Sequence, residues 1–114
     1  MRIAQVPPLT EAIPPRQYGG TERVVSYLTE ELVRQGHEVT LFASGDSQTS
    51  AELVALRERA LRHDDSVIDP IYHLLAQIDA VLERAHEFDV IHFHSDYYAP
   101  VSYTHLTLPT ICSV

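Results

Sequence analysis

Residues 19–44, GGTERVVSYLTEELVRQGHEVTLFAS, decide the fold of this chain. Apolar residues recur here at helical spacing and charged residues take the other face, which predicts a helix that starts at Gly19-Gly20 and ends before Gly36. Gly36 then stands where helices often end in a left-handed turn. Residues 38–44 favour a half-buried strand. The predicted apolar face comprises Thr21, Val24, Val25, Leu28 and Leu32, and the charged face Glu22, Arg23, Glu30, Glu31 and Arg34.

A strand is also expected before the helix, at residues 2–6, Arg-Ile-Ala-Gln-Val. The loop between them, residues 7–19, holds four prolines, and a loop of this length in a compact domain is usually functional or disordered. Strand, loop, helix and strand in this order form the opening βαβ unit of a parallel sheet. We therefore expect an α/β protein.

The second half of the chain predicts more of the same architecture. Residues 51–55 favour a short strand, followed by a helical turn up to residue 62. Asp69-Pro70 is typical of a helix start, and residues 70–87 predict a helix. Residues 89–94 predict a strand that is covered on both faces. The apolar stripe of the second helix comprises Ile71, Leu74, Leu75, Ile78, Leu82 and Ala85.

Composition excludes several classes of protein. The 114 residues include eight arginines, no lysine and 16 acidic residues, for a net charge of −8, which argues against nucleic acid or an anionic membrane as partner. No apolar run approaches the roughly 18 residues of a membrane span, and none at the N-terminus suits a signal peptide. Cys112 is the single cysteine and forms no internal disulfide, which fits a reducing compartment. We expect a cytoplasmic protein.

Residues 101–114 do not continue this pattern. Residues 101–110, VSYTHLTLPT, are spelled by the codons GTC TCT TAT ACA CAT CTG ACG CTG CCG ACG, which look like the mosaic end and adapter of a transposase-based sequencing library. The alternative is a genuine closing strand. We expect residues 1–100 to be the natural domain segment and residues 101–114 to be a non-native tail.

Three segments follow the carboxyl ends of predicted parallel strands, where open α/β sheets bind ligands. They are residues 7–20, 44–46 and 94–96. Gly19-Gly20 meets the start of the first helix, where backbone amides and the helix dipole favour a phosphate. A tight turn that needs only positive φ explains the pair equally well.

A nicotinamide cofactor is disfavoured at this edge, because the G-x-G-x-x-G fingerprint is absent. Asp46 stands about where a ribose-binding acid is found, but it lacks those glycines. A small nicotinamide-dependent oxidoreductase is therefore the least favoured interpretation.

His92 and His94 alternate with apolar residues, so they share one face of their strand. A metal pair is one interpretation, although a catalytic zinc normally needs a third protein ligand, and Asp96 is only a guess for it. His92 lies inside the strand and favours a structural role. His94, at the strand end, suits a hydrogen-bonding or proton-transferring role.

Three runs of this chain form a common pattern: PPRQYGGTERVV at 14–25, LVRQGHEVTLFASGDS at 32–47 and DVIHFHSDY at 89–97. Together they resemble the N-terminal domain of family 4 glycosyltransferases. The resemblance extends over residues 1–100 in order and spacing. It implies the opening part of a GT-B glycosyltransferase, a truncated Rossmann-like parallel sheet with flanking helices. It also implies retaining, metal-independent transfer of a sugar, of the hexosyltransferase type, from a nucleotide-sugar donor and without a cofactor.

The resemblance also assigns roles by position. Gly19, Gly20 and Thr21 correspond to the donor-diphosphate loop, and His94 to the active-site histidine near the transferred sugar. Asp96 and Tyr97 are expected on the acceptor side. No residue is expected to bind a metal.

The second, donor-binding domain of the family has no counterpart here, so the chain as written is expected to be inactive. The resemblance allows contact with a membrane surface, which the acidic charge does not support. The alternative from another functional class is a small non-catalytic α/β module that binds a phosphorylated ligand or a protein partner.

Overall fold

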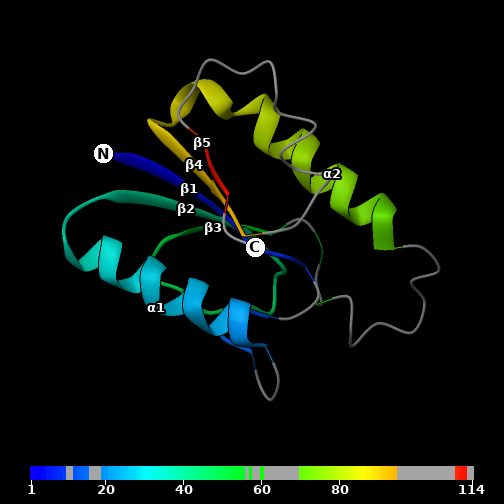
Figure 1. Ribbon diagram of the computed structural model, residues 1–114, viewed down its shortest axis with the longest axis horizontal. Coiled ribbons are helices and arrows are strands. Elements are labelled where there is room, and N and C mark those ends of the chain that lie inside the picture. Colours follow the sequence, from blue (N-terminus) through cyan, green and yellow to red (C-terminus); the bar gives the residue numbers. More distant parts are fainter. Residues whose placement is uncertain are drawn as a thin grey trace.

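The computed structural model describes residues 1–9, 12–15, 19–55, 57, 60, 70–94 and 110–112. Helices follow β1 and β3 in the described chain and return it to further strands of the same sheet, as in an α/β fold (Figure 1). In order they are β1 (Arg2–Val6), α1 (Gly20–Arg34), β2 (Glu38–Ala43), β3 (Glu52–Ala55), α2 (Pro70–Glu83), the 3₁₀ helix η2 (Ala85–Glu87), β4 (Val90–Phe93) and β5 (Thr110–Cys112).

The strands form one parallel sheet in the order β3-β2-β1-β4-β5. The chain therefore builds outward from β1 to one side and then crosses back to build on the other side. This order is that of a Rossmann-like sheet, whose direction of growth reverses next to the first strand. The two helices cover opposite faces of the sheet (Figure 1). The expected fold class is confirmed.

The first helix starts at the glycine pair and ends before Gly36, as predicted, and Gly36 adopts the positive φ of 93° expected after a helix end. Its predicted buried face is wrong in part. Val24 is 58% exposed, although the helical pattern predicts it on the apolar face. Glu22, placed on the charged face, is buried. The buried residues of α1 are Glu22, Val25, Ser26 and Thr29, so the helix presents mostly small and polar side chains to the protein interior.

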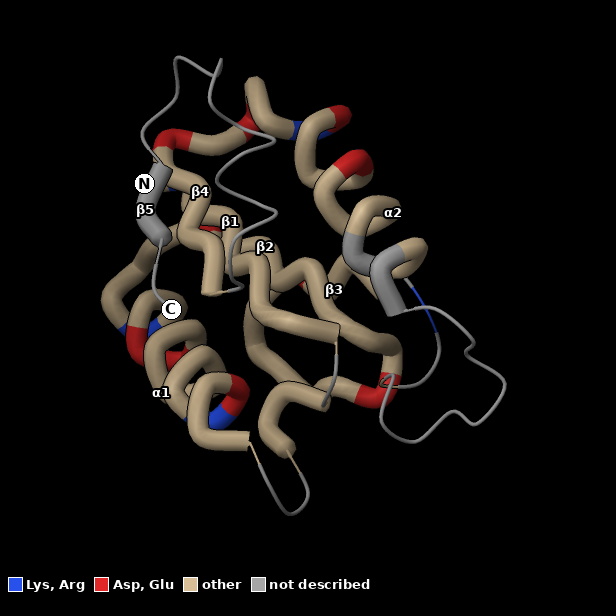
Figure 2. Tube along the Cα trace, turned by 45° about the vertical axis from the view of Figure 1, so that its right-hand side comes forward, with Lys and Arg blue, Asp and Glu red and all other residues tan. Residues whose placement is uncertain are grey.

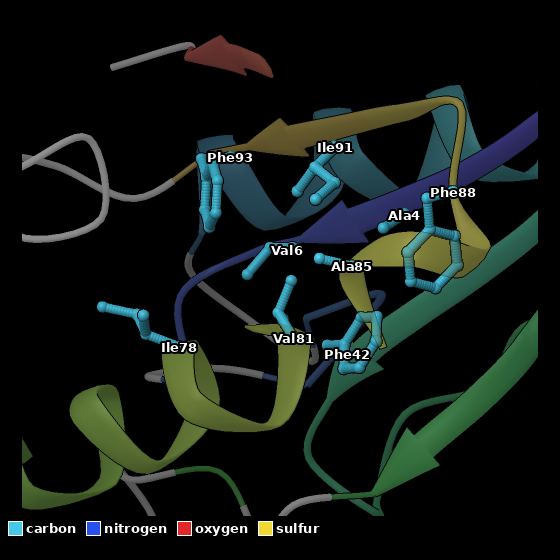
Figure 3. Packing of buried hydrophobic residues seen from close by; sticks show 9 residues of the cluster. All are labelled: Ala4, Val6, Phe42, Ile78, Val81, Ala85, Phe88, Ile91 and Phe93. Atoms are coloured by element: carbon cyan, nitrogen blue, oxygen red, sulfur yellow. The ribbon is translucent and has the colours of Figure 1, made fainter. Parts of the chain in front are cut away.

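The second helix is shorter than predicted, because α2 ends at Glu83 and the chain continues as η2. Its buried face is rotated relative to the predicted stripe. Leu75 is 50% exposed, whereas Gln77 and Val81 are buried. The apolar core on this face of the sheet draws on β1, β2, β4, α2 and η2 (Figure 3). It consists of Ala4, Val6, Phe42, Ile78, Val81, Ala85, Phe88, Ile91 and Phe93.

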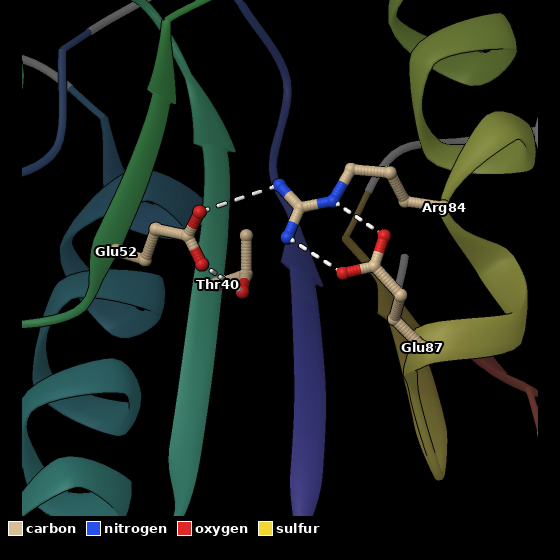
Figure 4. Close-up of polar contacts among 4 residues, drawn as sticks. All are labelled: Thr40, Glu52, Arg84 and Glu87. Atoms are coloured by element: carbon tan, nitrogen blue, oxygen red, sulfur yellow. Dashed lines mark hydrogen bonds and ion pairs between the residues drawn. The ribbon is translucent and has the colours of Figure 1, made fainter.

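Arg84 ties the amino ends of the strands to the segment before β4 (Figure 4). Its guanidinium donates two hydrogen bonds to Glu87, at 2.9 and 3.1 Å, and one to Glu52 of β3 at 3.4 Å. The guanidinium also lies 5.9 Å from the ring centroid of Phe42 and 5.7 Å from that of Phe88, within range of cation–π attraction. The hydrogen bonds from Arg84 to Glu87 lower the pKa of the Glu87 carboxyl.

The remaining strand predictions have mixed outcomes. β3 occupies residues 52–55, within the predicted 51–55, whereas most of the helical turn predicted up to residue 62 lies outside the described residues. β4 covers residues 90–93 of the predicted 89–94.

Residues 110–112 form β5 against β4. A strand edge pairs readily with any extended segment, so this pairing does not identify the origin of residues 101–114.

Acidic residues lie on both helices of the described chain, and basic ones are fewer (Figure 2). No helix in the described ranges combines the length and the apolar content that crossing a membrane demands.

Candidate functional site at the carboxyl edge of the sheet

The carboxyl ends of β1, β2 and β4 meet at one edge of the sheet, as predicted. The His94 amide donates to the Val6 carbonyl oxygen at 3.0 Å, which extends the pairing of β1 and β4 by one residue. On the face covered by α2, the side-chain amide of Gln77 donates to the carbonyl oxygens of Pro7, at 2.7 Å, and Phe42, at 3.0 Å. Backbone and side-chain bonds thus hold the three strand ends together.

The long loop after β1 is fastened to the segment after β2. The Ile13 amide donates to Ser47 Oγ at 2.9 Å, and the Gln48 amide donates to the Ile13 carbonyl oxygen at 2.7 Å. Helix α1 then runs back toward the start of β2, so its N-terminus lies at the same edge of the sheet (Figure 1).

Gly19 and Gly20 at that N-terminus differ in whether the structure has room for a side chain. Gly19 has a φ of 138°, and a Cβ there would lie 2.8 Å from Glu22 Oε2 and 3.1 Å from Pro15 Cβ. A Cβ on Gly20 would meet no atom within 4 Å. The tight-turn interpretation therefore accounts for Gly19. It does not account for Gly20, which opens the first helical turn to an incoming group.

The Glu22 carboxylate lies against Gly19 at the positive end of the helix dipole, where a negative charge is favourable. Glu22 is only 7% exposed. An anion that approaches this helix end therefore has the Gly20 side available, because the Gly19 side already faces a carboxylate.

His94 is buried at the end of β4 and stacks on His92. The ring centroids are 3.9 Å apart and the ring planes are inclined by 34°. His94 Nε2 lies 2.6 Å from Oε1 of Gln5, which is fully buried on β1. The predicted shared face of the two histidines is confirmed, and β1 supplies a polar partner from 89 residues away.

Burial lowers the pKa of His94 to about 4, and the neighbouring His92 ring contributes to the decrease. Burial also lowers the pKa of His92. Near neutral pH the His94 ring is therefore uncharged. Such a ring has one N–H donor and one acceptor nitrogen, and it does not act as a cation beside a phosphate.

Asp46 at the end of β2 is engaged by its own turn. Its Oδ1 accepts a hydrogen bond from Ser44 Oγ, and its Oδ2 accepts one from the Ala60 amide at 3.2 Å. One carboxylate oxygen thus binds within the turn, and the other links the turn to Ala60 beyond β3. Both contacts give Asp46 a structural role and further disfavour the ribose-binding interpretation.

Neither a metal centre nor a second polar site emerges from the remaining described residues. Within those ranges no three His, Cys, Asp or Glu side chains come together as metal ligands do. A hollow at the opposite, amino edge of the sheet is lined by residues that include Arg2, Thr40, Glu52 and Arg84. Arg84 is already paired with Glu87 and Glu52, and Arg2 Nε lies 4.0 Å from Asp89 Oδ2, so both arginines of the hollow have carboxylate partners.

The comparisons with known proteins agree with this geometry. The family model for Glycosyltransferase Family 4 matches residues 18–114, which is most of the chain. The chain belongs to Glycosyltransferase Family 4. No curated protein sequence matches it.

A solved structure similar to this Family 4 chain is that of AviGT4, a glycosyltransferase involved in avilamycin A biosynthesis. The TM-score is 0.58 at 24% sequence identity, which shows a common fold. The match covers 100% of this chain and 32% of AviGT4, so the chain spans about a third of the length of that protein.

The predicted site residues of the Family 4 chain fall into two groups. Gly19, Gly20 and Thr21 lie at the α1 N-terminus, and His94 lies at the end of β4, all at the carboxyl edge. Asp96 and Tyr97, predicted on the acceptor side, lie outside the described residues.

Sequence reasoning missed three polar residues of this edge: Gln5, Glu22 and Gln77. Gln5 offered a signal, because it is an amide among the apolar residues Ile3, Ala4 and Val6 of the central strand. Gln77 offered a similar signal, because it is an amide between the apolar residues Ala76 and Ile78 of α2. The burial of Glu22 depends on how α1 is rotated against the sheet, and the charge pattern of the helix suggested the opposite.

We predict that acid destabilises this chain partly through His94. Its folded-state pKa, about 4, is below the ordinary 6.5, so between these values the unfolded state binds more protons. The free energy of unfolding should therefore fall as the pH is lowered from about 6.5 to about 4. Denaturant unfolding at a series of pH values should show a smaller fall for His94→Gln than for the wild type. Equal falls in both proteins would contradict the assignment.

Proposed function

We propose that this Family 4 chain is the opening part of the N-terminal domain of a retaining, metal-independent glycosyltransferase with a GT-B fold. The parent enzyme would transfer a sugar, of the hexosyl type, from a nucleotide-sugar donor to an acceptor. The observation that carries the proposal is the meeting of a buried neutral histidine and an open helix N-terminus at one sheet edge, in a chain of this family.

The diphosphate and the sugar of a nucleotide-sugar suit different parts of this edge, namely the α1 N-terminus and the end of β4. The helix N-terminus at Gly20 and Thr21 offers backbone amides and a positive dipole end to the diphosphate. Gly19 holds the turn that presents these amides. The neutral ring of His94 suits the uncharged sugar better than the phosphates, because it supplies hydrogen bonds without a charge. Asp96 and Tyr97 are proposed to face the acceptor.

Stabilisation of the leaving diphosphate would come mainly from a second domain. The described edge contributes the Glu22 carboxylate beside Gly19 and the neutral His94 ring at the end of β4. Neither of these neutralises the charge that develops on a departing nucleoside diphosphate. The chain alone is therefore proposed to be inactive. We place the parent enzyme in the cytoplasm, without a cofactor.

The proposal predicts unequal effects of two neighbouring substitutions in the parent enzyme. His94→Ala should lower kcat about a hundredfold, the loss expected when one well-placed hydrogen-bonding group is removed from the transition state. His92→Ala, the matched control on the same strand face, should lower it only a few-fold. Product formation from a labelled nucleotide-sugar measures both. Small and equal losses would remove His94 from the active site.

A second candidate function follows if residues 101–114 are native. The observation that favours a genuine segment is the family match, which extends to residue 114. The chain would then be a non-catalytic α/β module that holds a phosphorylated ligand or a protein partner at the same edge.

Sequencing the source DNA across the codons for residues 99–110 separates the two functions. We predict that the reading frame continues past Pro100 into new coding sequence and that residues 101–114 derive from a sequencing adapter. If the codons for residues 101–114 and a stop codon are present in the source DNA, the tail is native. The non-catalytic function is then favoured.

A further inference from the structure

Gln5 is a buried amide placed against the proposed active-site histidine. The parallel register sets Gln5 opposite His92, and the strand continues to His94, whose amide bonds to the residue after Gln5. Gln5 Oε1 and His94 Nε2 are 2.6 Å apart, and the two residues are 0% and 5% exposed. The contact is therefore short, desolvated and fixed by the pairing of β1 with β4.

This contact determines which ring nitrogen of His94 carries the proton. A carbonyl oxygen only accepts hydrogen bonds, so Nε2 must donate to Gln5 Oε1. A neutral imidazole has a single N–H group, which leaves the lone pair on Nδ1. The His92 ring, 3.9 Å away, adds a stacking contact that restricts the orientation of the His94 ring.

The fold does not need an amide at position 5. Within the described part of the chain, Gln5 Nε2 is buried and has no hydrogen-bond partner. Its strand neighbours Ile3, Ala4 and Val6 are apolar and buried. A buried donor without a partner is unfavourable relative to an apolar side chain of similar size. Packing alone would therefore favour an unbranched apolar residue such as methionine at this position.

We infer that Gln5 is a positioning residue that holds His94 in the Nε2–H tautomer, so that Nδ1 accepts a hydrogen bond from a hydroxyl of the sugar substrate. This inference rests on the proposed role of His94. It also specifies the contact, because phosphate oxygens without protons cannot donate to the Nδ1 lone pair, whereas sugar hydroxyls can. The histidine thus selects for a hydroxyl, and the diphosphate is left to the amides at the start of α1.

Long-range ¹H–¹⁵N NMR spectra of the ¹⁵N-labelled chain report the tautomer of each histidine ring. The His94 signals are assigned by their loss in His94→Gln. We expect wild-type His94 at neutral pH to show a protonated Nε2 and an unprotonated Nδ1. A protonated Nδ1 in the wild type would overturn the inference, because the Gln5 amide would then be turned with its nitrogen toward the ring.

Two buried glutamines provide a matched pair of variants. Gln5→Met should convert His94 to a mixture of both tautomers, while its denaturation midpoint stays equal to that of the wild type or rises. Gln77→Met removes an amide bonded to two carbonyl oxygens on the other face of the sheet, so it should lower the midpoint and leave the tautomer unchanged. An unchanged tautomer in Gln5→Met would overturn the inference. If Gln5→Met fails to fold, Gln5 is needed for the fold and the inference is also overturned.

Turnover of the parent enzyme separates this inference from the proposed function. Gln5→Met should lower kcat about five- to tenfold, roughly one hydrogen bond, with a smaller change in KM for the donor. If His94→Ala leaves turnover unchanged, the proposed function fails whatever the tautomer. If His94→Ala abolishes turnover but Gln5→Met retains full kcat, only the role of Gln5 fails.

Discussion

β1 lies between β2 and β4, and its backbone pairs with both in parallel register. Every other element is placed around this strand, because α1 must return the chain to the start of β2 and α2 must carry it across to the start of β4. The pairing of the strands is therefore enough to bring three strand ends to one edge, and no contact among the site residues is needed for it. The register also sets position 5 of β1 opposite position 92 of β4, which brings the Gln5 amide to the His94 ring.

The two faces of the sheet differ: one carries the main apolar core, and the other carries the polar residues of the proposed site. The face under α2 holds the large aromatic core, with Phe42 and Phe88 packed edge to face at 5.9 Å. The face under α1 carries Gln5 and the two histidines beside a smaller apolar cluster. Burial on this second face costs stability, since it desolvates an amide and an imidazole. The same burial keeps His94 neutral and in one orientation, which a hydrogen bond to an uncharged sugar requires.

Sequence patterns predicted the elements better than their contacts. The bounds of β1 and α1 follow from local signals, namely a short β-rich run, helical periodicity and Gly36 after the helix. The buried face of α2 was mispredicted because the rotation of a helix against a sheet depends on the whole core. The contact between Gln5 and His94 joins residues 89 positions apart, and only the strand order reveals it. Gly19 and Gly20 looked alike in sequence, and only the local geometry separated a required turn from an open helix end.

A crystal structure of the parent Family 4 enzyme with a bound nucleotide-sugar tests the central claim, that the carboxyl edge of β1 and β4 is where the donor lies. The account predicts the diphosphate at the Gly20 side of the α1 N-terminus and a sugar hydroxyl within hydrogen-bond distance of His94 Nδ1. A donor seated elsewhere, for example at the amino edge beside Arg84, would contradict it.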